Sequence, residues 1–319
     1  MLSEFDIIER YFTPPTDHTV LAGGDDAALI AVTPGMELAI SADALVSGRH
    51  FFDDAEPAGV GYKCMGVNLS DMAAMGARPR WVTLSLTLPL ADANWLADFS
   101  RGFLEHAREH GVDLIGGDTT SGPLTVCVQI MGEVPPGQAL RRSGAREGDD
   151  LWLSGTIGDA ALALAHARGD FRLHADDLAY ATKRLTHPQP RVELGIVLRG
   201  IATSAIDISD GLAADVGHIA KASGVQAIMQ WALLPLSMAG ARYRDHPLVH
   251  WAVLAGGDDY EIAFTAPPAA RPQLVALAGD LGVALTRIGS MQAGQGVIVL
   301  SGRGEPLELA HKGFDHFRA

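Results

Sequence analysis

Residues 135–150 (PPGQALRRSGAREGDD) constrain the fold most, because they separate two segments that each mix strand and helix patterns. Proline, glycine and charged residues concentrate there, which is typical of a connection between domains. A chain of 319 residues also has the length of two ordinary domains. We therefore expect an N-terminal domain over residues 1–140 and a C-terminal domain over residues 141–319.

The N-terminal segment contains both hydrophobic periodicities. Residues 81–88 (WVTLSLTL) alternate apolar and polar side chains, which predicts a half-buried strand. Residues 94–109 place apolar side chains on one helical face, which predicts an amphipathic helix. Further elements are expected as a helix over 57–76 and as strands over 37–41, 112–115 and 124–134.

The C-terminal segment repeats this mixture. Strands are expected over residues 150–155, 204–208, 261–265, 284–288 and 297–300. Helices are expected over residues 159–168, 177–185, 191–201, 211–222 and 272–281. Strands and helices in both segments predict a two-domain protein of the α/β class, with α+β layers.

Charge and composition exclude several classes of function. The formal net charge is −14, which disfavours nonspecific binding to nucleic acid or to anionic membranes. No apolar run reaches the roughly 18 residues of a membrane span, and the N-terminus lacks the basic start of a signal peptide. The two cysteines, Cys64 and Cys127, fit core thiols of a reducing cytosol, so we expect a cytoplasmic protein.

Gly-Gly-Asp occurs three times, at residues 23–25, 116–118 and 256–258. The first and third copies continue into a second aspartate, Asp26 and Asp259. A single copy indicates only a turn, and Asp25 with Asp26 could form an Asx-turn. Three copies suggest a recurring way to present carboxylates.

Asp71 interrupts an apolar helical stripe. Val60, Cys64 and Val67 recur at helical spacing, and Asp71 is the next residue on that face. A carboxylate on an apolar face is costly unless it is paired or binds a cation. A buried ion pair with Lys63 or Arg78 is one explanation, and a metal ligand is the explanation that we favour.

Other aspartates follow predicted strands, where α/β proteins place their ligand groups. Asp43 follows residues 37–41, Asp118 follows residues 112–115, and Asp207 ends residues 204–207. Asp210 precedes a predicted helix and could also be only its N-cap. Several carboxylates share one site only with a cation, and Mg²⁺ is the oxygen-preferring ion that carboxylates and phosphates hold together.

Motifs of several common enzyme classes are absent from the sequence. No G-x-x-x-x-G-K-[ST] loop, protein-kinase signature, H-E-x-x-H pair or G-x-S-x-G elbow is found. The 12 histidines are scattered, and most are interpreted as surface or structural residues. A metal-dependent phosphate-ester hydrolase would also use clustered aspartates and remains an alternative.

Eight segments in order over nearly the whole chain resemble the thiamine-monophosphate kinase family. The segments are GGDDAA (23–28), ISADALVSGRHF (40–51), NLSDMAAMGARP (68–79), LIGGDTTSGP (114–123), RSGA (142–145), SAIDISDGL (204–212), GGDDYE (256–261) and KGFDHF (312–317). The same superfamily holds aminoimidazole ribonucleotide synthetase, selenophosphate synthetase and a hydrogenase-maturation protein.

The resemblance implies the aminoimidazole ribonucleotide synthetase-like fold. In that fold the N-terminal domain binds ATP and Mg²⁺ and forms a β-barrel across a homodimer, and the C-terminal α/β domain completes the active-site cleft. The implied reaction is direct transfer of the ATP γ-phosphate to thiamine monophosphate with several Mg²⁺ ions. This reaction is the last step of thiamine diphosphate biosynthesis.

The resemblance also assigns residues. Those that resemble metal-binding positions are Asp26, Ser41, Ala42, Asp43, Asp71, Asp118, Asp207 and Asp210. Gly117, Asp118, Arg142 and Ser209 resemble the ATP-binding positions. His50, Asp258 and Phe314 fall where the family contacts its thiamine substrate. Among these residues, the resemblance implies that Asp71, Asp118 and Asp207 are the catalytic ones.

Simpler roles remain open for two of the substrate positions. Phe314 could instead be a hydrophobic plug for the C-terminus, and His50 could simply complete a loop. Two positions depart from the family: Ala42 replaces its usual Thr, and Asp258 stands where Glu is frequent. Both departures affect fine geometry and leave the reaction class intact.

Two other functions are alternatives to the one that the resemblance implies. A different ATP-dependent enzyme of the superfamily is the first alternative, although residues 1–25 hold neither Cys nor Lys, unlike selenophosphate synthetases. A noncatalytic nucleotide-binding dimer is the second, and it would be expected to lose some of the metal aspartates. All of them are present.

Overall fold

The computed structural model describes residues 3–308 and residue 313, and these form two compact units. Unit 1 comprises Met1–Met72, Ala77–Gln138 and Thr186–Pro188. Unit 2 comprises Ala73–Gly76, Ala139–Leu185 and Gln189–Ala319. Of the helices in the described part of the chain, none is both long and apolar enough to cross a membrane.

Unit 1 is a four-stranded sheet with helices on one face. Its helices are α1 (Glu4–Tyr11), α2 (Pro57–Ala74) and α3 (Ala93–Glu109). Its strands are β1 (Thr19–Leu21), β2 (Leu29–Ile30), β3 (Glu37–Val46), β4 (Arg78–Leu88), β5 (Asp113–Ser121) and β6 (Thr125–Val134). The sheet order is β3-β6-β4-β5, in which only β4 and β5 are parallel, and β1 pairs with β2 separately.

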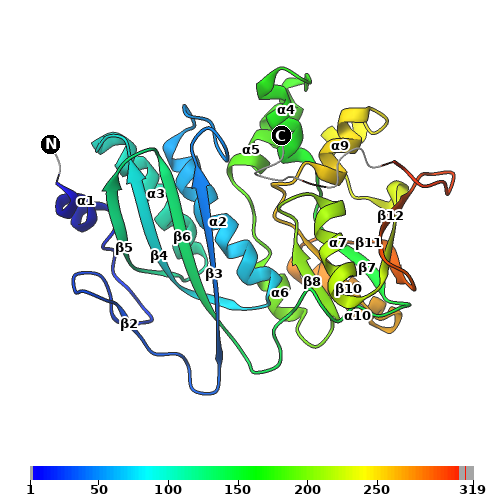
Figure 1. The fold of residues 1–319 in the computed structure, drawn as a ribbon, viewed down its shortest axis with the longest axis horizontal. Helices are drawn as coiled ribbons and strands as arrows, with labels where there is room; N and C mark the ends of the chain where they lie inside the picture. The colour runs from blue at the N-terminus through cyan, green and yellow to red at the C-terminus, as the bar shows by residue number, and fades with distance from the viewer. Residues whose placement is uncertain (1–2, 309–312, 314–319) are drawn as a thin grey trace. The chain divides into compact units, whose positions relative to one another are not determined.

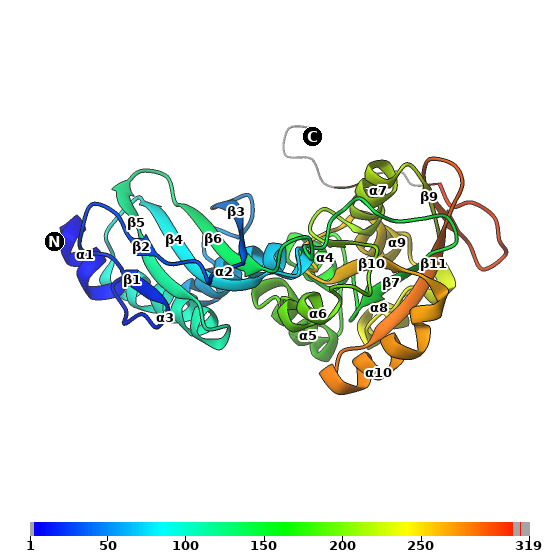
Figure 2. The same cartoon turned by 90° about the horizontal axis from the view of Figure 1, so that it is seen from below.

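One face of the unit 1 sheet is buried under α2 and α3 (Figures 1 and 2). Val128 and Ile130 of β6 are fully buried there, and cross-strand register aligns them with Leu84 and Val82 of β4. The two helices approach each other closely at glycines. A Cβ at Gly102 would overlap the backbone of Ala58, so only glycine allows this packing.

The opposite face of this sheet is only partly covered. A small cluster of Trp81, Ile115 and Met131 packs there against residues 28–38. Beyond this cluster the β3 side chains alternate, so that Ile40 and Val46 are exposed while Leu45 is buried. We call this surface the open face of the sheet.

Unit 2 is a six-stranded sheet packed with helices. Its strands are β7 (Asp150–Ser154), β8 (Ser204–Asp207), β9 (Gln226–Gln230), β10 (Ile262–Ala266), β11 (Leu285–Gln292) and β12 (Gly296–Leu300). Its helices are α4 (Asp159–Arg168), α5 (Ala175–Thr186), α6 (Val192–Val197), α7 (Leu212–Ser223), α8 (Met238–Arg242), α9 (Pro247–Ala255), α10 (Arg271–Leu281), η1 (Trp231–Leu233) and η2 (Pro268–Ala270). The sheet order is β12-β9-β11-β7-β10-β8, with β12 and β9 the parallel pair.

Strand alternation sorts the unit 2 side chains between two faces. Leu151 and Leu153 of β7 join the main apolar cluster with α4, α7 and α9. Trp152 points to the other face, where it stacks with Phe264 of β10. Helix α10 lies on the far side of the sheet from α7 (Figure 2). The predicted α/β class with layered sheets and helices is therefore confirmed.

Most predicted elements are present, but several strands are longer than expected, β3 and β5 most of all. β3 continues to Val46 because its antiparallel ladder with β6 is unbroken from Glu37 to Val46. β5 continues to Ser121 because its pairing with β4 includes Gly116 and Gly117 of the second Gly-Gly-Asp copy. Asp43 and Asp118 thus lie inside strands, and the expectation that they follow strand ends is wrong. Asp207 ends β8 as predicted.

Candidate functional site

In unit 1, Ser41 and Asp43 lie on the helix-covered side of the sheet. They alternate with the exposed residues of β3, and register places them opposite the buried Ile130 and Val128 of β6. Both are partly buried. A polar pair on a face that otherwise carries apolar side chains suggests a site held at the edge of the sheet.

Asp71 reaches this pair from helix α2. Its carboxylate Oδ2 accepts a hydrogen bond from the Ser41 hydroxyl at 2.5 Å. The predicted stripe is present, since Val60, Cys64 and Val67 are all buried, and Asp71 is partly exposed at its end. Strand β3 and helix α2 therefore bring three oxygen-bearing side chains to one place.

The chemistry of this donor set fits Mg²⁺. Ser41, Asp43 and Asp71 offer only oxygen atoms, which hard cations prefer. One turn before Asp71, the amide oxygen of the buried Asn68 has no hydrogen-bond partner among the described residues, while its amide nitrogen donates to the Cys64 carbonyl. The local arrangement thus presents a set of oxygen ligands of the kind that Mg²⁺ binds.

The remaining residues assigned to this part of unit 1 lie nearby in sequence. Asp26 is exposed in the segment between β1 and β2. Strand alternation turns the Ala42 side chain to the open face, so only its backbone could contact an ion beside Asp43. His50 lies in the turn after β3, where its Nδ1 accepts from the Val46 N–H at 2.9 Å.

Gly117 and Asp118 lie at the other edge of the sheet. Register aligns Asp43 with Val128, Val128 with Leu84, and Leu84 with Gly117. Three strand spacings separate the two edges, a distance of about 14 Å. Asp118 is exposed and pairs with the exposed Ser85, so it points to the open face. Unit 1 of a single chain does not bring Asp118 to the Ser41–Asp43–Asp71 group.

In unit 2, Asp207, Ser209 and Asp210 lie where β8 leads into α7. Asp207 is buried at the end of the strand, and Ser209 and Asp210 form the loop before the helix. Gly211 takes a φ of 112°, and a Cβ there would press on the Ala255 backbone. A glycine is needed for this tight entry into the helix.

The third Gly-Gly-Asp copy packs directly against this loop. The Asp258 N–H donates to the Ser209 carbonyl at 2.8 Å, and a Cβ at Gly257 would overlap the same oxygen. Asp258 itself has a φ of 65°, a left-handed conformation that is uncommon for aspartate. Uncommon backbone conformations often occur at functional sites, and the hydrogen bond to the Ser209 carbonyl holds Asp258 beside this loop.

Asp215 is a positioning residue that the sequence interpretation missed. Its buried carboxylate accepts from the backbone N–H groups of Ser209 and Asp210, both at 3.1 Å. Burial, followed by the charges of Asp207 and Asp210, raises the pKa of Asp215 to about 8. The sequence feature that could have identified Asp215 is its place in the first turn of α7, where a carboxylate can accept hydrogen bonds from backbone N–H groups.

One assigned residue, Arg142, is not brought to this loop. The Arg142 carbonyl accepts from Ser223 at the far end of α7, about 18 Å along the helix from Asp210. Phe314 lies outside the described residues. Its neighbour Gly313 is described, and a Cβ there would meet the Asp210 carbonyl oxygen at 3.1 Å.

Two family models match most of the chain. The AIR synthase related protein N-terminal domain matches residues 24–134, and the AIR synthase related protein C-terminal domain matches residues 146–301. The thiamine-monophosphate kinase of Escherichia coli K12 is 46% identical over 319 residues, which cover 98% of each chain. The chain belongs to the thiamine-monophosphate kinase family.

Solved structures agree with this membership. The crystal structure of thiamine-monophosphate kinase from Stenotrophomonas maltophilia K279a matches with a TM-score of 0.88 at 46% identity, covering 96% of this chain and 98% of that one. AaThiL complexed with AMPPCP and TMP matches with a TM-score of 0.78 at 28% identity, covering 90% and 89%.

Proposed function

We propose that this protein transfers the γ-phosphoryl group of ATP to thiamine monophosphate, which yields ADP and thiamine diphosphate. The observation that carries the proposal is its near full-length likeness to the E. coli kinase. A more distant family member bound to AMPPCP, an ATP analogue, and TMP supports both substrates. The reaction would complete thiamine diphosphate biosynthesis.

The chemical problem is that donor and acceptor are both phosphate anions, and the protein has a net charge of −14. Bound Mg²⁺ would neutralise and orient the phosphate oxygens, which is the main catalytic need in phosphoryl transfer. In unit 1 the proposed ligands are Asp26, Ser41, Asp43 and Asp71. In unit 2 they are Asp207 and Asp210.

The protein side chains would position the groups that contact the phosphates. Asp215 fixes the Ser209 and Asp210 backbone, so Ser209 can present its hydroxyl to a phosphate oxygen. The acceptor phosphate is already nucleophilic, so a general base is not required. We propose that Gly117, Asp118 and Arg142 contact ATP, where Arg142 adds a charge-assisted clamp.

The substrate contacts are proposed at His50, Asp258 and Phe314. His50 accepts from Val46 through Nδ1, so its neutral ring carries the proton on Nε2 and can donate to a ligand. The Asp258 carboxylate suits the cationic thiazolium ring of thiamine. Phe314 would stack on a thiamine ring.

We further propose that the active form is a homodimer. The open face of the unit 1 sheet exposes Ile40 at 57%, and the adjoining hairpin exposes Val20 at 66% and Leu29 at 56%. Monomeric proteins rarely leave such apolar groups together in water. Joining these faces of two chains, as in the β-barrel implied by the family, would bury them.

We place the reaction in the cytoplasm, where both free thiols, Cys64 and Cys127, would stay reduced.

One assay tests the function. The protein is incubated with ATP, Mg²⁺ and thiamine monophosphate, with EDTA and unphosphorylated thiamine as controls. Equal amounts of ADP and thiamine diphosphate, lost in both controls, are expected. ADP without thiamine diphosphate would instead indicate a different acceptor, as in the sister enzymes of the superfamily, and inorganic phosphate without either would indicate a hydrolase.

A further inference from the structure

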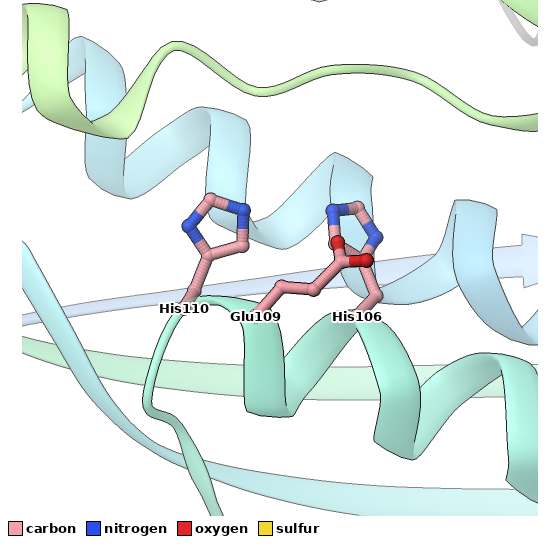
Figure 3. A group of neighbouring side chains, drawn as sticks. All are labelled: His106, Glu109 and His110. Carbon is pink, nitrogen blue, oxygen red and sulfur yellow. The ribbon is translucent and has the colours of Figure 1, made fainter.

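A second group of metal-ligating side chains lies at the C-terminal end of helix α3, away from the aspartates described above. His106, Glu109 and His110 project from the same side of the helix end (Figure 3). One ligand atom from each residue lies within 4.8 Å of the others. The spacing i, i+3, i+4 places all three on one helical face.

His106 is held in the orientation and tautomer of a metal ligand. Its ring is buried, with 1% of its surface exposed, and it stacks on Tyr62 of α2 at a centroid distance of 3.7 Å. Nδ1 lies 2.9 Å from the Tyr62 backbone carbonyl, which can only accept, so Nδ1 carries the proton. The lone pair of the neutral ring is then on Nε2, the usual arrangement of metal-bound histidine.

Glu109 is oriented by the same tyrosine. The Tyr62 hydroxyl donates to Glu109 Oε2 at 3.1 Å. Tyr62 thus supports two of the three side chains through separate atoms.

We propose that His106, Glu109 and His110 bind a borderline transition-metal ion, of which Zn²⁺ is the best match. Two imidazoles and a carboxylate suit Zn²⁺, whereas Mg²⁺ prefers oxygen ligands alone. Tetrahedral zinc bonds bring ligand atoms to roughly 3.4 Å from one another, so the group must contract slightly. Glu109 is exposed and His110 partly exposed, which leaves both side chains room to move.

The sequence carried a signal for this group. Residues 106–110 read H-A-R-E-H, the H-x-x-E-H spacing that some zinc peptidases use on a helix. The H-E-x-x-H pair, which the sequence lacks, has the reverse order. Here a bound ion would connect the end of α3 to α2 through Tyr62, and we assign it a stabilising role.

The test measures zinc binding to tag-free protein stripped with EDTA, in excess Mg²⁺ so that oxygen-only sites are occupied. Competition with a chromophoric chelator gives the affinity. The wild-type chain is expected to bind one zinc ion at this group, with binding weakened at least about tenfold in His110→Ala and Glu109→Gln. Tyr62→Phe keeps the ring and the carbonyl but loses the hydroxyl, and about tenfold weaker binding is expected.

His174→Ala is the matched control, since His174 is exposed and lies outside the group. It should bind zinc like the wild type, and zinc should raise the thermal midpoint of both. Zinc affinity that is the same in the wild type, His110→Ala and Glu109→Gln would overturn the proposal. Because none of these residues belongs to the proposed kinase site, activity in Mg²⁺ is expected to persist in every variant.

Discussion

Asp71 shows how one side chain can connect sequence pattern, packing and chemistry. It ends the buried stripe of α2, and its hydrogen bond to Ser41 joins that helix to β3. A carboxylate in this position costs desolvation free energy that a neutral residue would not. The cost is understandable if the carboxylate serves a cation.

Asp71→Asn is expected to lower kcat by at least about a hundredfold, because a neutral amide binds Mg²⁺ poorly. The amide oxygen can still accept from Ser41, so the unfolding free energy should change by less than about 1 kcal/mol. Steady-state kinetics and urea unfolding check both parts. Asp98→Asn, at an exposed carboxylate on α3, is the control and should leave kcat unchanged. Normal turnover by folded Asp71→Asn would remove Asp71 from the site.

Asp259 predicts a pH dependence of stability. Its Oδ1 accepts from the Gly158 N–H at 2.8 Å, and burial raises its pKa well above the ordinary value. In the unfolded chain the Asp259 carboxyl ionises near pH 4, whereas in the folded chain it stays protonated to a higher pH. The stabilisation is therefore complete below about pH 4 and is lost as pH rises through the raised pKa.

Asp259→Asn mimics the protonated acid and keeps the Gly158 bond. Its unfolding free energy relative to the wild type should therefore increase from about pH 5 to about pH 8. Urea unfolding at both values measures this difference. Asp259→Ala, which leaves the Gly158 N–H without its acceptor, should be less stable than Asp259→Asn throughout. A pH-independent difference between the Asp259→Asn variant and the wild type would contradict the protonated state.

At the scale of elements, the sequence predicted most strands and helices but not where the site strands end. Alternation in residues 81–88 and helical spacing in residues 94–109 were sufficient for β4 and α3. β3 and β5 exceeded their predictions because polar and glycine residues, which usually mark strand ends, are held there by cross-strand pairing. Long-range pairing of this kind leaves no local signal.

The same limit explains which parts of the site were found. Strand alternation places Ser41 with Asp43, and the helical stripe leads to Asp71, so local patterns were enough. The separation of Asp118 from this group depends on strand order, which the sequence did not give. Short elements were also missed, namely α1, β1, β2, β9, α8 and α9, none of which is longer than nine residues.

Gly117 tests the pairing of β4 with β5, because the two strands approach each other closely at this residue. Its φ of 151° and the adjacent Leu84 carbonyl leave no space for a Cβ. Gly117→Ala should lower the unfolding free energy by about 3 kcal/mol and reduce activity. Gly116→Ala, where a Cβ would meet nothing within 4 Å, is the matched control and should cost less than about 1 kcal/mol. Equal stability of the two variants, measured by urea unfolding, would show that β5 can shift away from β4.

At the scale of the whole molecule, the question is how Asp43 and Asp118 could serve one reaction. They occupy opposite edges and opposite faces of the same sheet. A second copy of the chain would allow Asp118 of one protomer to act with Asp43 of its partner. The homodimer proposed above would then complete each site rather than only bury apolar surface.

Complementation tests this arrangement. Asp43→Asn and Asp118→Asn chains with different tags are co-expressed, and the heterodimer is isolated. Each homodimer should be inactive, whereas the heterodimer should recover about half of wild-type activity, since one of its two symmetric sites is intact. An inactive heterodimer would mean that both aspartates act within one chain, and a monomer in light scattering would exclude the dimer itself.

The exposed outer side of β3 also has a consequence for biosynthesis. A newly folded chain would display an unpaired edge strand with Ile40 and Val46 toward water. Such edges recruit other strands indiscriminately, which makes them starting points for aggregation. Productive assembly then competes with misassembly in the interval after release from the ribosome, so overproduction in a heterologous host should yield more native enzyme when synthesis is slowed.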